Sequence, residues 1–181
     1  MIETANLKLI PCELQHFEAI LEDQKQLAQM LGVIVYDDWF DFPGVASIEA
    51  IRFSHEYLKA NPDALWWWTY FFIHAKDNVL VGLGGYKGKA DESGMVEIGY
   101  AIIPAYRRRG LATEAARGLV DHAFSHPHIE RVDGQTLPEG NDSTRVLEKV
   151  GMRRVGTAHD PDVGAVWQWS LNRVDYRKQS L

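Results

Sequence analysis

The spacing of apolar residues changes several times along the chain, and each change predicts a new element of secondary structure. Between residues 111 and 124, apolar side chains recur at intervals of three and four, which is the spacing of one helix face. Residues 79–86 and 95–103 are instead strand-like, and the second stretch is rich in β-branched and aromatic residues with weak alternation. Breaker residues such as Pro104 separate such stretches and mark where one element ends.

The same reasoning gives an order of elements for the whole chain. Strands are expected over 7–10, 65–74, 79–86, 95–103 and 131–137, and near 153–158 and 166–171. Helices are expected around 14–21, 27–31, 48–58, 111–124 and 142–150, with a loop over 33–46. This order predicts an α+β fold, a mixed and largely antiparallel sheet flanked by helices.

Local signals predict several element ends. Gly32 is well placed to end the second helix, and Ser47 is a candidate N-cap for the third. The turn at 76–78 predicts an antiparallel hairpin. Gly99, in the middle of the strand 95–103, predicts a bulge or a close approach of another backbone. The tail from Arg173 is polar and is expected to be frayed.

Composition narrows the class of protein. With 181 residues and 46% hydrophobic residues, the chain is expected to form one domain over residues 1–181. It contains no apolar run of about 18 residues and no basic-then-apolar leader, so we expect a soluble protein without a membrane partner. Cys12 is the single cysteine, and a cytoplasmic location is therefore expected. The net charge of −6 argues against nucleic acid as a partner.

Positive charge is concentrated at one strand-to-helix junction. Three consecutive arginines, Arg107 to Arg109, and Gly110 lie between the strand 95–103 and the helix that begins at Leu111. The first turn of a helix carries backbone N–H groups without intrahelical partners and a partial positive charge. This junction therefore predicts an anion site, and a pyrophosphate is a suitable ligand.

The residues at this junction resemble a known signature. Arg107-x-x-Gly110-x-Ala112 is similar to the Arg/Gln-x-x-Gly-x-Gly/Ala motif of the GNAT superfamily of acyl-CoA-dependent N-acetyltransferases. Downstream, residues 143–152 (STRVLEKVGM) resemble the Ser-x-x-Val-Leu-Glu-Lys-x-Gly-Phe segment of the branch that includes ribosomal-protein N-terminal acetyltransferases. In that branch an asparagine usually stands three residues before the serine. Here that position is Gly140, and Asn141 follows it.

The resemblance implies a fold and a cosubstrate site. In the GNAT fold the fourth and fifth strands splay apart, and the resemblance places them at 95–103 and 131–137. Acetyl-CoA is the implied cosubstrate, and no metal is implied. The implied cofactor-binding residues are Tyr100, Ile102, Ile103, Arg107, Arg108, Arg109, Gly110, Leu111, Ala112, Thr113 and Asn141. Backbone amides of residues 108–113 would hold the pyrophosphate, and Asn141 has a helix cap as its alternative role.

Two residues are candidates for catalysis. Acetyl transfer needs a neutral amine, and Glu97 is the candidate general base, acting through water. Many GNAT enzymes protonate the departing thiolate with a tyrosine four residues before the closing glycine of the second motif, but that position here is Leu147. Ser143 is the candidate hydrogen-bond donor to the sulfur instead. The alternatives are an ordinary strand residue for Glu97 and a helix-start residue for Ser143.

The acceptor is less defined. Asp37, Asp38 and Trp39 belong to an acidic and aromatic stretch that suits a cationic amine, and a solvated acidic loop is the alternative. The predicted function is acetyl transfer from acetyl-CoA to a primary amine, either a protein N-terminal α-amine or a small molecule. The alternative is an acyl-CoA-binding regulatory module without transfer. The resemblance alone suggests a homodimer.

Overall fold

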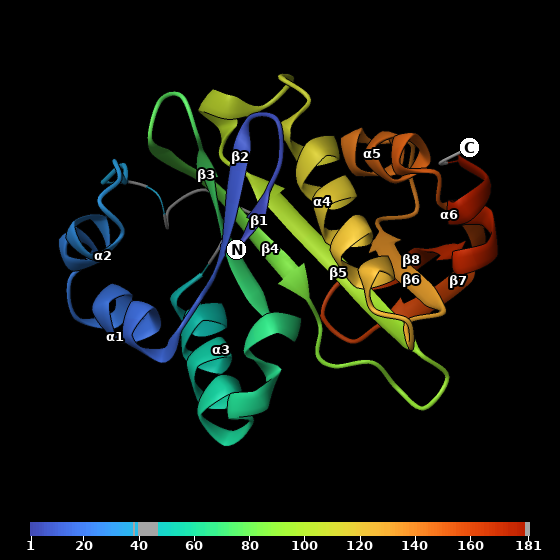
Figure 1. The fold of residues 1–181 in the computed structure, drawn as a ribbon, viewed down its shortest axis with the longest axis horizontal. Coiled ribbons are helices and arrows are strands. Elements are labelled where there is room, and N and C mark those ends of the chain that lie inside the picture. Colours follow the sequence, from blue (N-terminus) through green and yellow to red (C-terminus); the bar gives the residue numbers. More distant parts are fainter. Residues whose placement is uncertain (38, 40–46, 180–181) are drawn as a thin grey trace.

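The computed structural model describes residues 1–37, 39 and 47–179, and Figure 1 shows how their elements are arranged. In this part of the chain eight strands form one sheet, in the order β1-β2-β3-β4-β5-β6-β8-β7. The strands are β1 (Ile2–Glu3), β2 (Leu7–Pro11), β3 (Thr69–His74), β4 (Val79–Tyr86), β5 (Met95–Ile102), β6 (Arg131–Thr136), β7 (Arg153–Asp160) and β8 (Gly164–Asn172). The helices are α1 (Leu14–Glu22), α2 (Gln24–Leu31), α3 (Ile48–Ala60), α4 (Leu111–Ser125), α5 (Asp142–Val150) and α6 (Arg173–Gln179), with short 3₁₀ helices η2 (Pro62–Trp67) and η3 (Pro104–Tyr106).

The sheet is mixed and largely antiparallel, as the sequence predicts. Neighbouring strands from β1 to β5 are antiparallel, and so are the pairs that β8 makes with β6 and β7. β5 and β6 are parallel, and their pairing runs only from Met95↔Arg131 to Ile98↔Gly134. The described residues beyond these pairs do not continue the ladder between β5 and β6. The expected splaying of these two strands is therefore confirmed.

Helices pack on both faces of the first part of the sheet. On one face lies α1, where the ring of His16 meets Phe71 of β3 edge-on, with ring centroids 5.8 Å apart. On the other face lies α4, where the carbonyl oxygen of Leu119 accepts a hydrogen bond from Tyr86 Oη of β4 at 2.7 Å. α5 lies beside α4 (Figure 1). None of the described helices combines the length and apolar composition needed to cross a membrane.

Several predicted element ends are confirmed. Gly32 ends α2 in the left-handed conformation, with φ 63°. Ser47 caps α3, and its Oγ accepts a hydrogen bond from the Ala50 amide at 3.1 Å. These signals are local, because each depends on a backbone conformation or a hydrogen bond within four residues.

One predicted strand begins later than expected. The sequence predicts a strand over 65–74, but residues 62–67 form η2 and β3 starts at Thr69. Pro62 stands at the start of η2, where its fixed φ favours a helical turn. The Trp66 carbonyl oxygen accepts a hydrogen bond from Tyr70 Oη at 2.8 Å. The carbonyl group at this turn is thus satisfied by a side chain and not by a neighbouring strand.

The prediction of a frayed tail is wrong, because residues 173–179 form α6. Arg173 is 9% exposed. Its guanidinium donates to the carbonyl oxygens of Ile129 at 2.6 Å and Phe124 at 2.9 Å, and also to that of His126. These carbonyl groups lie at the end of α4 and in the turn after it, where intrahelical donors are lacking. Arg173 therefore ties α6 to the end of α4.

β5 has no bulge at Gly99, but the backbone of Gly84 on β4 does approach it closely. Gly99 pairs in register with Gly85, and a Cβ built on Gly99 meets no atom within 4 Å. The close approach lies on β4, where a Cβ on Gly84 would collide with the Gly99 carbonyl oxygen and one on Gly85 with the Trp68 carbonyl oxygen. The β4 glycines permit this tight packing, and Gly99 leaves open space on its own face of β5.

Candidate active site

A cavity opens where β5 and β6 part. Its volume is about 750 Å³, which lies within the common range of roughly 300–1,000 Å³ for small-molecule sites. Its walls come from β5, from the entry and first turn of α4, and from α5 along most of its length. The residues expected to bind or act on the cosubstrate that line it are Tyr100, Ile102, Arg107, Arg108, Gly110, Leu111, Ala112, Thr113, Asn141 and Ser143. The structure therefore brings together residues from both sequence motifs.

The first turn of α4 faces this cavity with unpaired amides. Arg108 and Gly110 have φ of 60° and 81°, and these left-handed conformations turn the chain into the helix. The Glu114 amide donates to the Gly110 carbonyl oxygen at 3.0 Å. For the helical amides of Leu111, Ala112 and Thr113, the described part of the chain offers no acceptor within hydrogen-bonding geometry. Such amides at a helix N-terminus suit an anion.

The glycine at this turn keeps the space beside the amides open. A Cβ built on Gly110 meets no atom within 4 Å, although Gly110 lines the cavity. A glycine here leaves room beside the helix entry for a ligand's anionic group. The lining thus fits a pyrophosphate-bearing ligand in its charge, its donors and its shape.

The three arginines of the junction divide into two groups. Arg107 and Arg108 line the cavity, and Arg107 Nε also donates to the Ile102 carbonyl oxygen at 2.8 Å. Arg109 does not line it. Its Nη2 donates to the Ala105 carbonyl oxygen at 2.9 Å, and its guanidinium lies 4.4 Å from the centre of the Tyr106 ring. The side chain of Arg109 is therefore occupied by its own turn.

Ile103 and Trp39 lie in the core. The Ile103 amide donates to the Val81 carbonyl oxygen at 2.9 Å, so it is not available to pair with a ligand. Trp39 is 0% exposed, and its Nε1 donates to the Leu80 carbonyl oxygen at 3.0 Å. The expectation that the Trp39 ring forms part of an acceptor rim is therefore wrong, because burial of a large aromatic ring dominates at this position.

The other two residues of the expected acceptor segment give little support. Asp37 is exposed to solvent, and no ligand-facing arrangement follows from its position. Asp38 lies outside the described residues, as do residues 40–46.

The start of α5 forms the wall opposite α4. Asn141 Oδ1 accepts a hydrogen bond from the Thr144 amide at 3.0 Å, and Thr144 Oγ1 accepts one from the Asn141 amide at 3.1 Å. This reciprocal pair is a capping box, so the helix-cap interpretation of Asn141 is confirmed. The carbonyl oxygen of Ser143 accepts a hydrogen bond from Tyr100 Oη at 3.3 Å. Burial raises the pKa of Tyr100, which keeps its hydroxyl protonated.

Leu147 is part of the core. It is 1% exposed, and a Cβ built on Gly134 of β6 would lie 3.3 Å from Leu147 Cδ1. The leucine therefore packs against the strand and supplies no proton donor to the cavity. Hydroxyl groups that do belong to lining residues are those of Tyr100, Tyr106, Thr113 and Ser143, and the Tyr106 hydroxyl donates to Asp77 Oδ2 at 2.9 Å.

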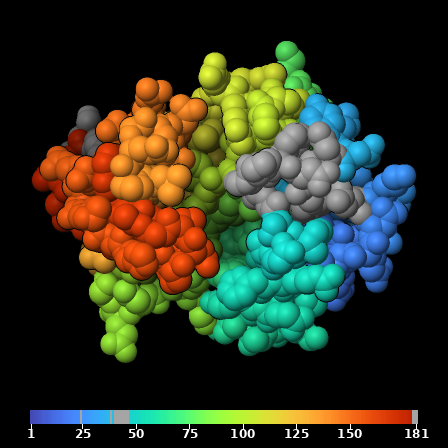
Figure 2. Space-filling view, turned by 180° about the vertical axis from the view of Figure 1, so that it is seen from behind, coloured from blue at the N-terminus to red at the C-terminus, as the bar shows by residue number. Residues whose placement is uncertain are grey.

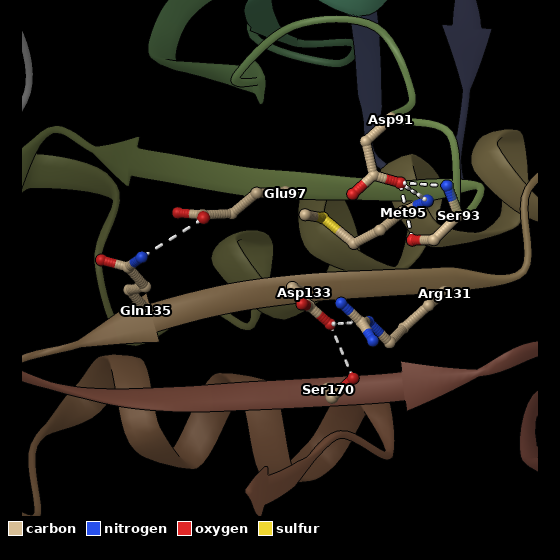
Figure 3. Close-up of polar contacts among 8 residues, drawn as sticks. All are labelled: Asp91, Ser93, Met95, Glu97, Arg131, Asp133, Gln135 and Ser170. Carbon is tan, nitrogen blue, oxygen red and sulfur yellow. Dashed lines mark hydrogen bonds and ion pairs between the residues drawn. The ribbon is translucent and has the colours of Figure 1, made fainter. Parts of the chain in front are cut away.

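Glu97 lies on the other face of β5, outside the cavity lining (Figure 3). Its side chain is 19% exposed, its Oε1 forms an ion pair with Lys87, and its Oε2 accepts from Gln135 Nε2 at 3.3 Å. Because side chains alternate along a strand, Ala101 shares this face, and Ala101 lines the cavity. The face that carries Glu97 therefore leads along β5 to the edge of the cavity.

A second carboxylate, Asp133 of β6, lies beside Glu97 in the sheet, where the two residues are paired. Ser170 Oγ donates to Asp133 Oδ1 at 2.6 Å, and Arg131 Nε lies 3.0 Å from the same oxygen (Figure 3). Asp133 is thus engaged by two partners of its own, which makes it a useful reference for Glu97.

The side of the molecule opposite α4 is hollowed between α3 and the β7–β8 segment, with strands at its floor (Figure 2). Aromatic side chains gather on α3. The ring of Tyr57 stacks on Trp68 with centroids 3.9 Å apart, and Phe53 is 65% exposed. Within the described residues, no cluster of three or more histidine, cysteine, aspartate or glutamate side chains is arranged to hold a metal ion.

Sequence reasoning missed further positive charge at the cavity. Arg145 and Lys149 of α5 line it, so both of its helical walls carry cations. Their spacing of four residues places them on one helix face, and this signal could have been used. The pairing of Lys87 with Glu97 could not be read from spacing, because the two residues meet through the β4–β5 pairing.

Comparisons with known proteins agree with this geometry. The family model described as an acetyltransferase (GNAT) domain matches residues 6–153. The uncharacterized N-acetyltransferase YjdG of Bacillus subtilis (strain 168) is 28% identical over 151 residues, which are 83% of this chain and 88% of that protein.

Two solved structures share the fold at low identity. The aminoglycoside acetyltransferase AAC(6')-Ib in complex with coenzyme A has a TM-score of 0.68 at 17% identity, covering 97% of this chain and 99% of that chain. A putative ribosomal-protein-serine acetyltransferase from Vibrio cholerae has a TM-score of 0.64 at 19% identity, covering 94% and 96%. The names of these two structures indicate different acceptors, so the shared fold does not identify the acceptor of this chain.

Proposed function

The chain belongs to the GNAT acetyltransferase family and is an acetyl-CoA-dependent N-acetyltransferase, and from this premise we propose how its residues divide the work. Acetyl-CoA lies in the cavity between β5 and β6, and a cationic primary amine approaches along the face of β5 that carries Glu97. The observation that supports this proposal most directly is the convergence, at one cavity, of the partnerless α4 amides and the first turn of α5.

The amides of residues 108–113 and the side chains of Arg107 and Arg108 hold the pyrophosphate. Charge-assisted hydrogen bonds of this kind are roughly twice as strong as neutral ones. The unpaired edge of β5 beyond Ile98 offers backbone groups to the pantetheine arm, as an added strand would pair with them. Acetyl-CoA supplies an acetyl group activated as a thioester.

Glu97 prepares the amine. A lysine-like amine has a pKa of about 10 and an α-amine one of about 8, so both are largely protonated at neutral pH. Glu97 attracts the ammonium group and accepts its proton through water, which leaves a neutral nitrogen with a free electron pair. Its position on the face of β5 that leads to Ala101, a residue that lines the cavity, supports this role.

Ser143 and Tyr100 stabilise the leaving sulfur. Both line the cavity, and the Tyr100 hydroxyl reaches across the gap between β5 and α5. A free thiol has a pKa of about 8.5, so one hydrogen bond is sufficient help near neutral pH, and the buried Leu147 is not needed. The Ser143 hydroxyl can donate it, and the Tyr100 hydroxyl can do so once it releases the Ser143 carbonyl oxygen.

The acceptor is a cationic amine of one of two kinds. The hollow between α3 and the β7–β8 segment is open in Figure 2, and such a shape admits the end of a polypeptide as well as a small polyamine or aminoglycoside. The carboxylate of Glu97 and the aromatic side chains of Phe53 and Tyr57 favour positive charge. The alternative of a binding module without transfer is set aside, because the family is one of acetyltransferases.

The test is release of free thiol from acetyl-CoA by the purified protein with a panel of amines. The panel contains peptides with different N-terminal residues, polyamines and aminoglycosides, and each acceptor is also measured without enzyme. Release with one class identifies the acceptor. Tight binding of acetyl-CoA with no release across the panel would contradict a cationic primary amine as the acceptor.

A further inference from the structure

A primary amine of the chain itself already occupies the position proposed for the acceptor. Lys87 follows the last residue of β4, and its amide donates to the Glu97 carbonyl oxygen at 2.9 Å. The two side chains therefore start directly opposite each other on neighbouring strands. Lys87 Nζ forms an ion pair with Glu97 Oε1, the carboxylate that we propose as the general base.

The space above Gly99, between this ion pair and the cavity, is open. Gly85 and Gly99 are paired between Lys87–Glu97 and the cavity edge, and a Cβ on Gly99 would meet no atom within 4 Å. Ala101, two residues further on, lines the cavity. A strand rises about 3.3 Å per residue, so along β5 Gly99 lies about 7 Å and Ala101 about 13 Å from Glu97. A lysine ammonium on its flexible four-carbon stem reaches the level of Gly99, so the reaction requires the thioester to extend from the cavity edge at Ala101 to Gly99.

Lys87 is also free to move. Its side chain is 55% exposed, so its ammonium group stays in contact with solvent although its partner Glu97 is largely buried. The neighbouring Lys89 has a similar exposure of 47%, but it is paired with Asp63 at 2.5 Å and not with Glu97. The two lysines thus differ in the feature that matters here, which is contact with the proposed base.

Resting on the proposed function, we propose that Lys87 is a self-acetylation site, modified within the same molecule when no external acceptor is present. Glu97 takes one proton from the Lys87 ammonium. The free electron pair of Nζ then forms a bond to the thioester carbonyl carbon, the carbon–sulfur bond breaks, and its electron pair leaves with the sulfur. The second nitrogen proton passes through solvent, so the products are an Nζ-acetyl amide, coenzyme A as its thiol and one released proton.

The modification has a direct consequence for the site. An acetylated lysine carries no charge, so Glu97 loses its internal cationic partner. The carboxylate is then open to the ammonium of an external acceptor. Lys87 therefore occupies the acceptor position beside Glu97 until the enzyme's own reaction neutralises its charge.

The experiment incubates the full chain with acetyl-CoA and no acceptor, and follows the intact mass and the acetylated peptides over time. One acetyl group per chain is expected, located on Lys87, at a rate per molecule that does not change with protein concentration. Lys87→Arg should abolish this mass increase, Lys89→Arg should leave it unchanged, and Glu97→Gln should slow it. Heat-unfolded protein measures chemical acetylation by the thioester alone.

The outcomes separate this inference from the proposed function. Thiol release with an external amine but no acetyl group on Lys87 would overturn the inference and leave the proposed function standing. Equal labelling of Lys87 and Lys89, or equal labelling in unfolded protein, would also overturn it, because it indicates chemical acetylation. A rate per molecule that rises with protein concentration would overturn modification within one molecule. Failure of every external amine to release thiol would count against the proposed function instead.

Discussion

Replacing Gly110 by alanine tests whether the entry to α4 holds the pyrophosphate. Gly110 has φ 81° and lines the cavity, and a Cβ placed there meets no atom within 4 Å. The added methyl group therefore causes no clash within the protein. It occupies space that the ligand needs and imposes a left-handed conformation on a residue with a side chain.

Two effects are expected, with different magnitudes. The left-handed conformation costs roughly 1–2 kcal/mol for a residue with a Cβ, so the free energy of unfolding should fall by about that amount. Loss of one hydrogen bond to a charged group costs about 1.5–3 kcal/mol. Since about 1.4 kcal/mol corresponds to a tenfold change, the dissociation constant for coenzyme A should rise roughly 10- to 150-fold.

Gly164→Ala is the matched control. Gly164 has φ 82° and likewise has no atom within 4 Å of a built Cβ, but it does not line the cavity. Urea unfolding should show a similar loss for both variants, and calorimetric titration with coenzyme A should show weaker binding for Gly110→Ala alone. The reasoning is refuted if Gly110→Ala binds coenzyme A within about twofold of the unmodified chain, a difference of roughly 0.4 kcal/mol.

Three further substitutions test other parts of the structure. Glu97→Gln should lower kcat by about 10²- to 10⁴-fold without changing the dissociation constant for acetyl-CoA. Asp133→Asn, on the same face of the sheet, should keep kcat near that of the unmodified chain, and equal losses in steady-state kinetics would remove the special role of Glu97. Arg173→Lys should lower the free energy of unfolding by about 2–4 kcal/mol, because a lysine cannot bond all three carbonyl groups. In the same urea titrations, Arg177→Lys on the exposed part of α6 should change the free energy of unfolding by less than about 0.5 kcal/mol. Burial lowers the pKa of His122 from 6.5 to about 4, so the unfolded chain binds a proton on this imidazole more tightly than the folded chain does. The free energy of unfolding should therefore fall as pH drops from about 6.5 to about 4. His122→Gln should flatten that part of the curve of stability against pH, and an unchanged slope would contradict the role of His122.

The sequence predicted the ends of helices correctly where the contacts that determine them are local. The bounds of α5, the cap at Ser47 and the end of α2 at Gly32 follow from hydrogen bonds within one turn, so neighbouring residues are sufficient to predict them. The two motifs also identified most of the cavity lining, because each motif supplies one continuous wall.

Sequence reasoning failed where a residue's partner is distant along the chain. The sequence predicts that Arg173 begins a frayed polar tail, but the carbonyl groups that accept its hydrogen bonds are 44 to 49 residues away. Trp39 reads as a rim residue, and its partner Leu80 is 41 residues away. The division among the arginines fails for a different reason. Which guanidinium turns toward the cavity depends on side-chain conformation, and the sequence pattern carries no information on that.

The short parallel pairing of β5 and β6 also bears on aggregation. Unpaired strand edges attract other strands and are a common starting point of intermolecular sheets. Here the pairing of β5 with β6 stops at Ile98↔Gly134, so an unpaired strand edge lies inside the sheet and not at its border. Residues from the first turns of α4 and α5 line the cavity beside this edge. Under the proposed function, the pantetheine arm pairs with this edge, so a bound cosubstrate would also cover backbone groups that could otherwise attract another strand.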